Sequence, residues 1–239
     1  MTIMKKSLIC LVALLSLTLG FTSCEKKSEG LTKITYYATL QLEGDEYIEL
    51  LKGDTYTEPG FEAIMDGKDV KDQVVLDGAV NTSVAGVYPI IYTITNADGF
   101  SSSAKRIVVV IDPADPIQGH WACTPTSSRS YKGADAEFGA SFKILIVGNN
   151  GDGNYYVDDI LAGWYAQRAG YGDEYAMEAV ISVADDGAIT LKSSYVPGWK
   201  DGLTKFENGQ FDAGTKTITY KATYVSGMQF DVTLNKVEE

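Results

Sequence analysis

Histidine and cysteine are scarce in this chain of 239 residues, which has one histidine, His120, and three cysteines. Any Ser-His-Asp or Cys-His catalytic arrangement would have to use His120. Its neighbour Cys123 is three residues away, and on a strand this spacing places the two side chains on opposite faces. One histidine with one available cysteine is also too little for a zinc site of nitrogen and sulfur ligands. We therefore expect no enzyme of this type, no metal site and no cofactor.

Basic residues are also few. Lysine and arginine together number 20, against 32 aspartate and glutamate residues, and no basic cluster occurs along the sequence. Nucleic-acid binding depends on clustered positive charge at the phosphates, so this pattern argues against a nucleic-acid partner. An acidic balance mainly favours solubility.

The first 24 residues combine the parts of an export signal. Lys5 and Lys6 precede the apolar run Leu8–Leu19, which is too short to span a bilayer comfortably, and small residues then lead to Cys24. This order resembles a bacterial lipobox of the loose kind seen in Bacteroidetes. The resemblance implies that residues 1–23 are a lipoprotein signal peptide and that Cys24 carries the lipid that anchors the protein in the membrane.

An ordinary signal peptide with a chance cysteine is the alternative, since Phe21 stands where the commonest lipobox has leucine. The signal holds two basic residues and no acidic one, so its removal brings the formal charge from −12 to −14. It also removes Cys10, and with Cys24 lipidated only Cys123 remains, so no internal disulfide can form. We predict a lipoprotein of the cell envelope, lipid-anchored in the outer membrane and facing the exterior.

Two breaks divide the mature chain. Residues 24–33 hold the lipidated cysteine and a polar stretch of mixed charge that is typical of a flexible tether. Two prolines within Asp112–Pro116 remove two backbone donors and fix two φ angles, which ends a strand and forms a short, stiff linker. The sequence therefore predicts one domain over residues 34–112 and a second over residues 117–239.

The first domain has the period of β-strands. Its side chains alternate so that one face of a strand collects Tyr88, Ile90, Tyr92 and Ile94, and Asn96–Gly99 has the composition of a hairpin turn. Turn residues punctuate the earlier half at short intervals. This spacing favours an immunoglobulin-like β-sandwich.

Three segments of this domain resemble the bacterial surface Ig-like domain: Tyr56–Ala63, Asp69-Val70 and Gly86–Gly99. Gly86-x-Tyr88 also resembles a tyrosine corner, with Ile90 where an antibody domain holds its second cysteine. The resemblance implies a spacer or adhesive module and assigns no chemistry.

The second domain is also β by period, with at least eight alternating runs separated by turn residues and no long helical window. Consecutive hairpins over about 120 residues can close into an antiparallel barrel, lipocalin-like in outline, or form a second sandwich. The sequence favours the barrel and leaves both open. The fold class is all-β in either case.

Three segments of the second domain, Gly153–Asp159, Gly163–Tyr165 and Thr217–Tyr220, complete a wider resemblance. With the signal and the Ig-like domain, they resemble Bacteroidetes surface lipoproteins that pair this Ig-like domain with a C-terminal β domain of unknown function. Such proteins are often encoded with glycan-uptake systems, so the resemblance implies a carbohydrate connection. It implies no catalytic residue.

Two acidic segments could carry other chemistry. Asn149–Asn154 could suggest calcium, but an EF-hand alignment places Tyr155 where glycine is needed and Leu161 where glutamate is needed, so a hairpin turn is favoured. Pairs such as Asp158-Asp159 and Asp173-Glu174 could in principle hydrolyse glycosides. Nothing in the sequence distinguishes them from chance pairs, and we expect a non-catalytic protein.

Aromatic residues provide the remaining signal. They gather around the glycine-rich segment Ala162–Gly172 and around Pro197-Gly198, and polar neighbours could bond sugar hydroxyls. The candidate glycan-binding residues are Trp164, Tyr165, Gln167, Arg168, Tyr171, Asp173, Tyr175, Tyr195 and Trp199. Alternatively, the two tryptophans fill the barrel core, or the patch binds a protein. The sequence predicts glycan binding for polysaccharide capture or uptake; the alternative is a structural, adhesin or accessory protein that docks on another envelope protein.

Overall fold

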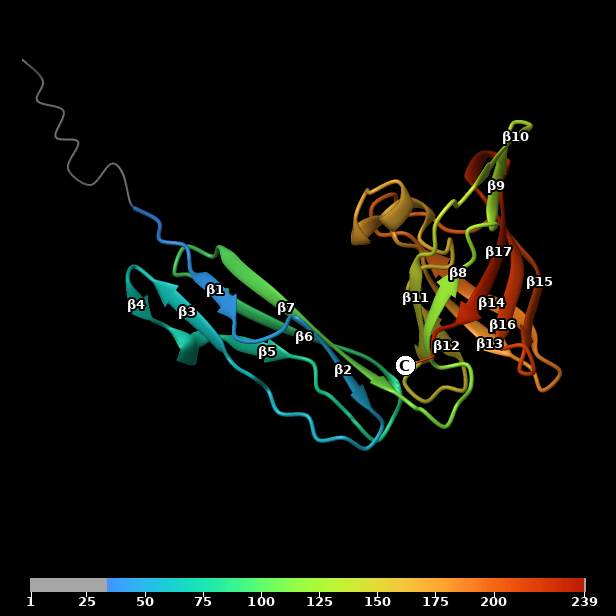
Figure 1. The fold of residues 1–239 in the computed structure, drawn as a ribbon. Coiled ribbons are helices and arrows are strands. Elements are labelled where there is room, and N and C mark those ends of the chain that lie inside the picture. The colour runs from blue at the N-terminus through green and yellow to red at the C-terminus, as the bar shows by residue number, and fades with distance from the viewer. Residues whose placement is uncertain (1–33, 239) are drawn as a thin grey trace, which may run out of the picture. The chain divides into compact units, whose positions relative to one another are not determined.

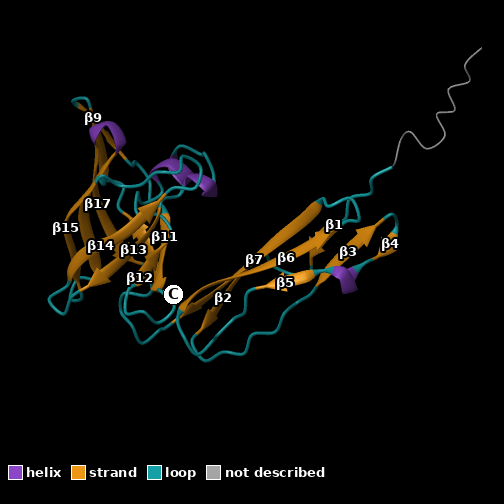
Figure 2. Cartoon of the chain, turned by 180° about the vertical axis from the view of Figure 1, so that it is seen from behind, coloured by secondary structure: helices purple, strands orange, loops and turns teal. Residues whose placement is uncertain are grey.

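The computed structural model describes residues 34–238, and they form an all-β protein (Figures 1 and 2). The predicted signal peptide, Cys24 and the tether lie outside these residues. Within the described range, no helix is long and apolar enough to cross a membrane. The all-β prediction is confirmed.

The Ig-like part has seven strands in two sheets. Their bounds are β1 (Thr39–Leu42), β2 (Tyr47–Leu51), β3 (Phe61–Met65), β4 (Lys68–Asp69), β5 (Val75–Asp77), β6 (Gly86–Thr95) and β7 (Ser101–Ile111), with one 3-10 turn, η1 (Lys71–Gln73). One sheet has the order β1-β3-β4 and the other the order β2-β7-β6-β5. All pairs are antiparallel except β2 with β7, which is parallel.

The core of this part lies between the two sheets. Alternate side chains of β6 point inward, and Ile90, Tyr92 and Ile94 are all buried. They pack with Phe61, Val108, Ala63 and Val70 in two adjoining clusters. The Tyr88 hydroxyl donates to the Val84 carbonyl at 2.7 Å, which is the bond of a tyrosine corner.

The C-terminal part is built from ten strands and three short helical turns. The strands are β8 (Gly119–Cys123), β9 (Ser128–Tyr131), β10 (Ala134–Glu137), β11 (Lys143–Gly148), β12 (Tyr155–Val157), β13 (Glu178–Val183), β14 (Ala188–Tyr195), β15 (Lys205–Asp212), β16 (Thr217–Tyr224) and β17 (Met228–Lys236). The turns are the π-helix η2 (Trp164–Arg168) and the 3-10 helices η3 (Asp173–Tyr175) and η4 (Val225–Gly227).

Eight of these strands close into an antiparallel barrel. The pairing runs β8-β11-β12-β13-β14-β15-β16-β17, and β17 pairs with β8 again, with Leu234 opposite Cys123. Strands β9 and β10 form a hairpin that extends the β17 edge. The barrel is therefore the correct one of the two architectures that the sequence left open.

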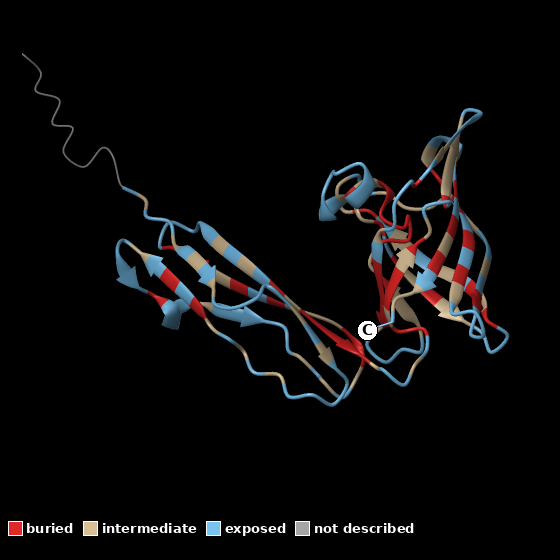
Figure 3. Ribbon diagram, viewed as in Figure 1, coloured by how far each residue is buried: buried red, intermediate tan, exposed pale blue. Residues whose placement is uncertain are grey.

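Side chains fill the inside of the barrel, as expected for eight strands. Trp121, Ile144, Met177, Ile181 and Leu234 are among those that are at most 2% exposed. Figure 3 shows the resulting alternation of buried and exposed residues along the strands.

The meander divides the connections between two ends of the barrel. Because neighbouring strands run antiparallel, the connections β12–β13, β14–β15 and β16–β17 share one end, and the connections β11–β12, β13–β14 and β15–β16 share the other. The first end carries η2, η3 and η4, and we call it the aromatic end. The second we call the acidic end.

Candidate functional site

A buried carboxylate shapes the longest connection at the aromatic end, the segment between β12 and β13. The Asp159 Oδ1 atom accepts hydrogen bonds from the Leu161 N–H at 2.9 Å and the Met177 N–H at 3.1 Å. Its Oδ2 atom accepts from the Gly163 N–H at 3.1 Å. Burial raises the pKa of Asp159 to about 6, although these hydrogen bonds favour the ionised form. The side chain therefore ties both ends of the segment together.

The π-helix η2 places a tryptophan inside the domain. Gly163 precedes η2 with φ of 83°, and a Cβ atom there would lie 2.6 Å from the Phe142 Cβ atom, so only glycine fits. The next residue, Trp164, is 4% exposed and packs edge-on against Phe138 and Phe230, with ring centroids 4.9 and 5.9 Å apart. Trp164 is thus a core residue and offers no face to a ligand, unlike the position given to it on the candidate platform.

Two arginines lie over the Trp164 ring. The Arg168 guanidinium carbon is 4.1 Å from its centroid, and that of Arg129 in β9 is 5.1 Å away. The Arg168 Nε–H donates to the Phe138 carbonyl at 3.0 Å. Arg129 also hydrogen-bonds the Tyr165 hydroxyl. Both cations are therefore fixed in place by cation–π contacts and hydrogen bonds.

A second loop, between β14 and β15, brings Trp199 to the same end. Val196 and Asp201 bridge its base, and the Gly198 N–H donates to the Glu174 carbonyl at 2.7 Å. A Cβ atom on Gly198 would lie 2.6 Å from the Tyr175 ring. Any residue other than glycine at this position would therefore push the loop away from η3. This contact holds Trp199 beside the tyrosines of the neighbouring loop.

Five rings form what we call the aromatic surface cluster: Tyr165, Tyr171, Tyr175, Trp199 and Tyr224. Trp199 is at its centre, with ring centroids 4.7 Å from Tyr165, 4.9 Å from Tyr175, 6.0 Å from Tyr171 and 6.1 Å from Tyr224. Two connections of the barrel, β12–β13 and β14–β15, and the last residue of β16 supply these rings. The fold therefore collects at one end residues that are far apart in the sequence.

The cluster is open to solvent. Tyr171 is 55% exposed and Trp199 is 38% exposed, whereas Tyr224 is buried beneath them with its hydroxyl 2.6 Å from Asp201 Oδ1. Burial and Asp201 both raise the pKa of Tyr224, so this hydroxyl stays protonated. The outer rings thus rest on a layer of aromatic side chains that is itself part of the core.

The other candidate residues lie at the margins of the cluster. Gln167 donates its Nε2–H to the Lys143 carbonyl at 2.8 Å, and Asp173 opens η3 on the exposed surface. Tyr195 is 47% exposed but makes no ring contact with the cluster. Sequence reasoning missed Tyr224 and Arg129. Tyr224 ends β16 and Arg129 lies in β9, and nothing in either strand's sequence indicates that these side chains lie close to η2.

The side chains of His120 and Cys123 do not face each other. His120 Nε2 lies 2.9 Å from the Glu49 Oε2 atom of β2. Cys123 points to the opposite face of β8, into the barrel core, where its sulfur accepts the Phe142 N–H at 3.2 Å. Burial raises the pKa of this thiol, which keeps it protonated and unreactive.

The acidic segments have structural roles. Asp152 accepts from the Asn149 amide and the Asn154 N–H, which are the bonds of a tight turn between β11 and β12. Asp158 accepts the Leu145 N–H at 2.9 Å. Over residues 34–238, no group of three or more histidine, cysteine or acidic residues is arranged to hold a metal ion.

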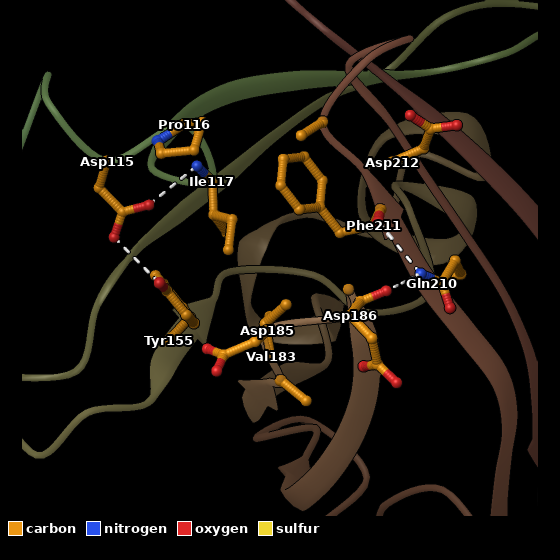
Figure 4. A pocket seen from close by; sticks show the side chains of 13 residues that line it. Asp115, Pro116, Ile117, Tyr155, Val183, Asp185, Asp186, Gln210, Phe211 and Asp212 are labelled. Carbon is orange, nitrogen blue, oxygen red and sulfur yellow. Dashed lines mark hydrogen bonds between the residues drawn. The ribbon is translucent and has the colours of Figure 1, made fainter.

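An open pocket of about 580 Å³ lies at the acidic end (Figure 4). Ile117, Phe211 and Val183 contribute apolar surface, and Asp185 and Asp186 belong to the turn between β13 and β14. Tyr155 closes one side through a hydrogen bond from its hydroxyl to Asp115 Oδ2 at 3.0 Å. The wall thus combines carboxylates with apolar side chains.

Comparisons with known proteins match the two parts of the chain separately. A family model for a C-terminal domain matches residues 110–236, and the model for the Ig-like domain of bacterial surface proteins matches residues 40–110. The crystal structure of the lipoprotein BT2262 from Bacteroides thetaiotaomicron is 36% identical, covers 84% of this chain and 100% of its own, and has a TM-score of 0.60. The chain belongs to the BT2262-like lipoprotein family. The predicted pairing of an Ig-like domain with a C-terminal β domain in a Bacteroidetes-type lipoprotein is confirmed.

Other comparisons add little to the BT2262-like assignment. A structure of CBM51-2 in complex with GlcNAc and INT domains from Clostridium perfringens ZmpB is 9% identical and covers 84% of this chain and 44% of its own, with a TM-score of 0.26. A score this low carries no argument. No curated protein matches the chain. Family and surface-domain matches together indicate a protein of the bacterial cell envelope.

Proposed function

We propose that this lipoprotein binds a glycan on the aromatic surface cluster and takes part in polysaccharide capture or uptake. The observation that carries the proposal is the position of Trp199, an exposed indole bounded by four tyrosine rings. Pyranose rings present flat faces of C–H groups, which stack on indole and phenol rings. Contiguous exposed apolar patches mark interaction sites, and Trp199 forms one with the neighbouring rings of Tyr171 and Tyr175.

The rigidity of the cluster supports the same proposal. A binding surface that is ordered before binding loses less conformational entropy when the ligand arrives. Asp159 fixes the first loop and Gly198 fixes the second against η3. Polar groups accompany the rings, with Asp173 exposed in η3 near Tyr175 and Gln167 exposed in η2. These groups can bond sugar hydroxyls while the rings take the apolar faces.

The proposal includes the anchor and its orientation. A diacylglycerol on Cys24 holds the chain in the outer membrane, and the protein faces the exterior, where polysaccharides are met. The role is non-catalytic. Replacing Cys24 with alanine should release the protein from membranes, and protein that stays with the membrane fraction would contradict the anchor.

The binding test uses the chain from Glu25 onward and a panel of host and plant polysaccharides. Trp199→Ala should weaken binding by about tenfold or more, because it removes the central stacking surface. Tyr195→Ala is the matched control, since Tyr195 is 47% exposed against 38% for Trp199 and makes no ring contact with the cluster. No binding by the unaltered chain, or equal loss in both variants, would overturn the proposal.

A second function is favoured by a different surface. On the Ig-like sheet, Val75 is 66% exposed, Leu76 is 47% exposed and Ile91 is 38% exposed, and β5 is an open edge. Such a surface suits docking on another envelope protein as a structural, adhesin or accessory subunit. Co-purification of a defined partner from native membranes that is lost in Val75→Asp, without any sugar binding, would favour this function.

A further inference from the structure

Arginine is used sparingly in this acidic protein. The chain has three arginines, and Arg106 is enclosed in the Ig-like core with Glu58 3.1 Å away. The other two, Arg129 and Arg168, both lie against Trp164 at the aromatic end. They come from different elements, β9 and η2. Their meeting is therefore a product of the fold and has no counterpart in the sequence pattern.

The two guanidinium groups border the aromatic surface cluster. Arg129 hydrogen-bonds Tyr165, whose ring centroid is 4.7 Å from that of Trp199. Arg168 is the last residue of η2, and its side chain is exposed apart from the Trp164 contact. Lys132, at the tip of the β9–β10 hairpin, lies 5.0 Å from the Tyr131 ring and adds a third positive charge nearby.

Neither arginine is neutralised. Among the residues that the structure describes, neither forms an ion pair with a carboxylate, and the buried Arg129 Nε atom has no hydrogen-bond acceptor. Cation–π contacts hold the groups in place but leave their positive charge uncompensated. Asp173 and Glu174, the nearest exposed acids along the chain, belong to η3 beside Tyr175. Charge is thus divided across the cluster, with arginines on the η2 side and carboxylates on the η3 side.

We propose that the ligand of the aromatic surface cluster is an anionic glycan, whose carboxylate or sulfate group binds Arg168 and Arg129 while its rings stack on Trp199 and Tyr171. This rests on the proposed glycan-binding function. A guanidinium presents a planar fork of donors that matches carboxylate and sulfate oxygens. The other acidic groups of the surface repel such a polymer only weakly where they lie more than about 8 Å from it, because salt screens charges beyond that distance.

The test compares polymers that differ in charge alone. Polygalacturonate and its methyl ester share one backbone, and κ-carrageenan and its chemically desulfated form are a similar pair with and without sulfate. Binding of the chain from Glu25 onward is measured by calorimetry at about 50 and about 300 mM salt. We expect the charged member of at least one pair to bind about tenfold more tightly, and the preference to shrink at the higher salt. The pair that shows the preference identifies carboxylate or sulfate.

Three variants localise the effect. Arg168→Gln should remove the preference, so that the charged polymer and its neutral partner bind the variant with equal affinity. Arg168→Lys, which keeps the charge but loses the fork, should retain part of it. Lys105→Gln removes a charge from an exposed site on β7 and should change nothing. Circular dichroism confirms that each variant is folded.

The outcomes separate this inference from the proposed function. Equal binding of charged and neutral polymers, lost in Trp199→Ala, would overturn the anionic preference and leave glycan binding intact. A charge preference that survives Arg168→Gln in a folded protein would overturn the assignment to the arginines. Absence of binding to all four polymers, and to the wider panel, would overturn both.

Discussion

The Trp199 indole meets the Tyr165 ring edge-on, with centroids 4.7 Å apart and ring planes at 87°. Tyr165 directly follows Trp164, which is buried, so a single step along the chain leads from the barrel core to the surface cluster. The exposed tryptophan is therefore supported by the core without belonging to it. This division allows stability and binding to be measured separately.

Replacing each tryptophan by alanine should separate these two roles. Trp164→Ala should lower the free energy of unfolding by about 3–5 kcal/mol, because it leaves a large cavity among Phe138 and Phe230. Trp199→Ala should cost about 1 kcal/mol, since mainly edge contacts are lost. Urea unfolding followed by circular dichroism checks both values. Equal losses would mean that Trp199 also belongs to the core.

Gly198→Ala should disturb the cluster from a position outside it. The added methyl group would lie 2.6 Å from the Tyr175 ring and 3.0 Å from the Glu174 carbonyl, so the loop must move away from η3. We expect a loss of stability of about 1–2 kcal/mol and weaker ligand binding. Gly214→Ala, whose new methyl group would meet only the end of the Asp212 side chain at 3.2 Å, is the control. Wild-type binding by Gly198→Ala would show that the close approach is unnecessary.

Stability should fall as the pH rises from about 5 to about 8. Burial raises the pKa of Asp158 to about 7 and that of Asp159 to about 6. The folded state therefore holds protons that the unfolded chain has already released, and this stabilisation is lost as the pH passes through the folded pKa values. Carboxyl groups whose pKa is lowered in the folded state, such as Asp112 and Glu58, stabilise the fold when ionised, and this stabilisation is lost as the pH falls through their folded pKa values.

Asp158→Asn isolates this effect. The asparagine keeps the oxygen that accepts the Leu145 N–H but cannot ionise. The variant should gain stability relative to the wild type as the pH rises through 7, measured by urea unfolding at several pH values. Parallel profiles for the two proteins would contradict the raised pKa.

The stability of the Ig-like domain should depend on Arg106. Its guanidinium is fully buried and donates to the Glu43 carbonyl at 2.8 Å and the Gly60 carbonyl at 3.0 Å, besides its ion pair with Glu58. Arg106→Met should cost about 3–5 kcal/mol, because several buried acceptors lose their donor. All three tryptophans lie in the barrel domain, so their fluorescence reports on the barrel while circular dichroism reports on both domains. An early dichroism transition with unchanged fluorescence is expected; coincident transitions at the wild-type midpoint would contradict the role of Arg106.

The strands could be predicted because alternation is a local property. The spacing of Ile90, Tyr92 and Ile94 predicts that they share one face, and all three are buried. The choice between barrel and sandwich depends on whether Leu234 meets Cys123, which no local pattern encodes. The site was predicted in part for the same reason. Glycines and aromatic residues marked the two loops, but only tertiary packing decides that Trp164 turns inward and Trp199 outward.

The contact of Arg129 with Trp164 could not be predicted from the sequence. The two residues are in different elements, and nothing in the composition of β9 distinguishes this arginine from an exposed strand residue. The π-helix could not be predicted from the sequence either. Its hydrogen bond from the Arg168 N–H to the Gly163 carbonyl at 2.8 Å begins at a glycine that Phe142 approaches too closely for a Cβ atom.

Closure of the barrel by its first and last strands has a consequence for how the chain is made. The hairpins from β11 to β16 can form as the chain emerges during synthesis or export, whereas the seam between β8 and β17 must wait for residues 228–236. A chain that stops short within β17 would keep most of its hairpins and still present two bare sheet edges. Those edges would pair with a second truncated copy, so we expect truncation within β17 to produce strand-exchanged oligomers.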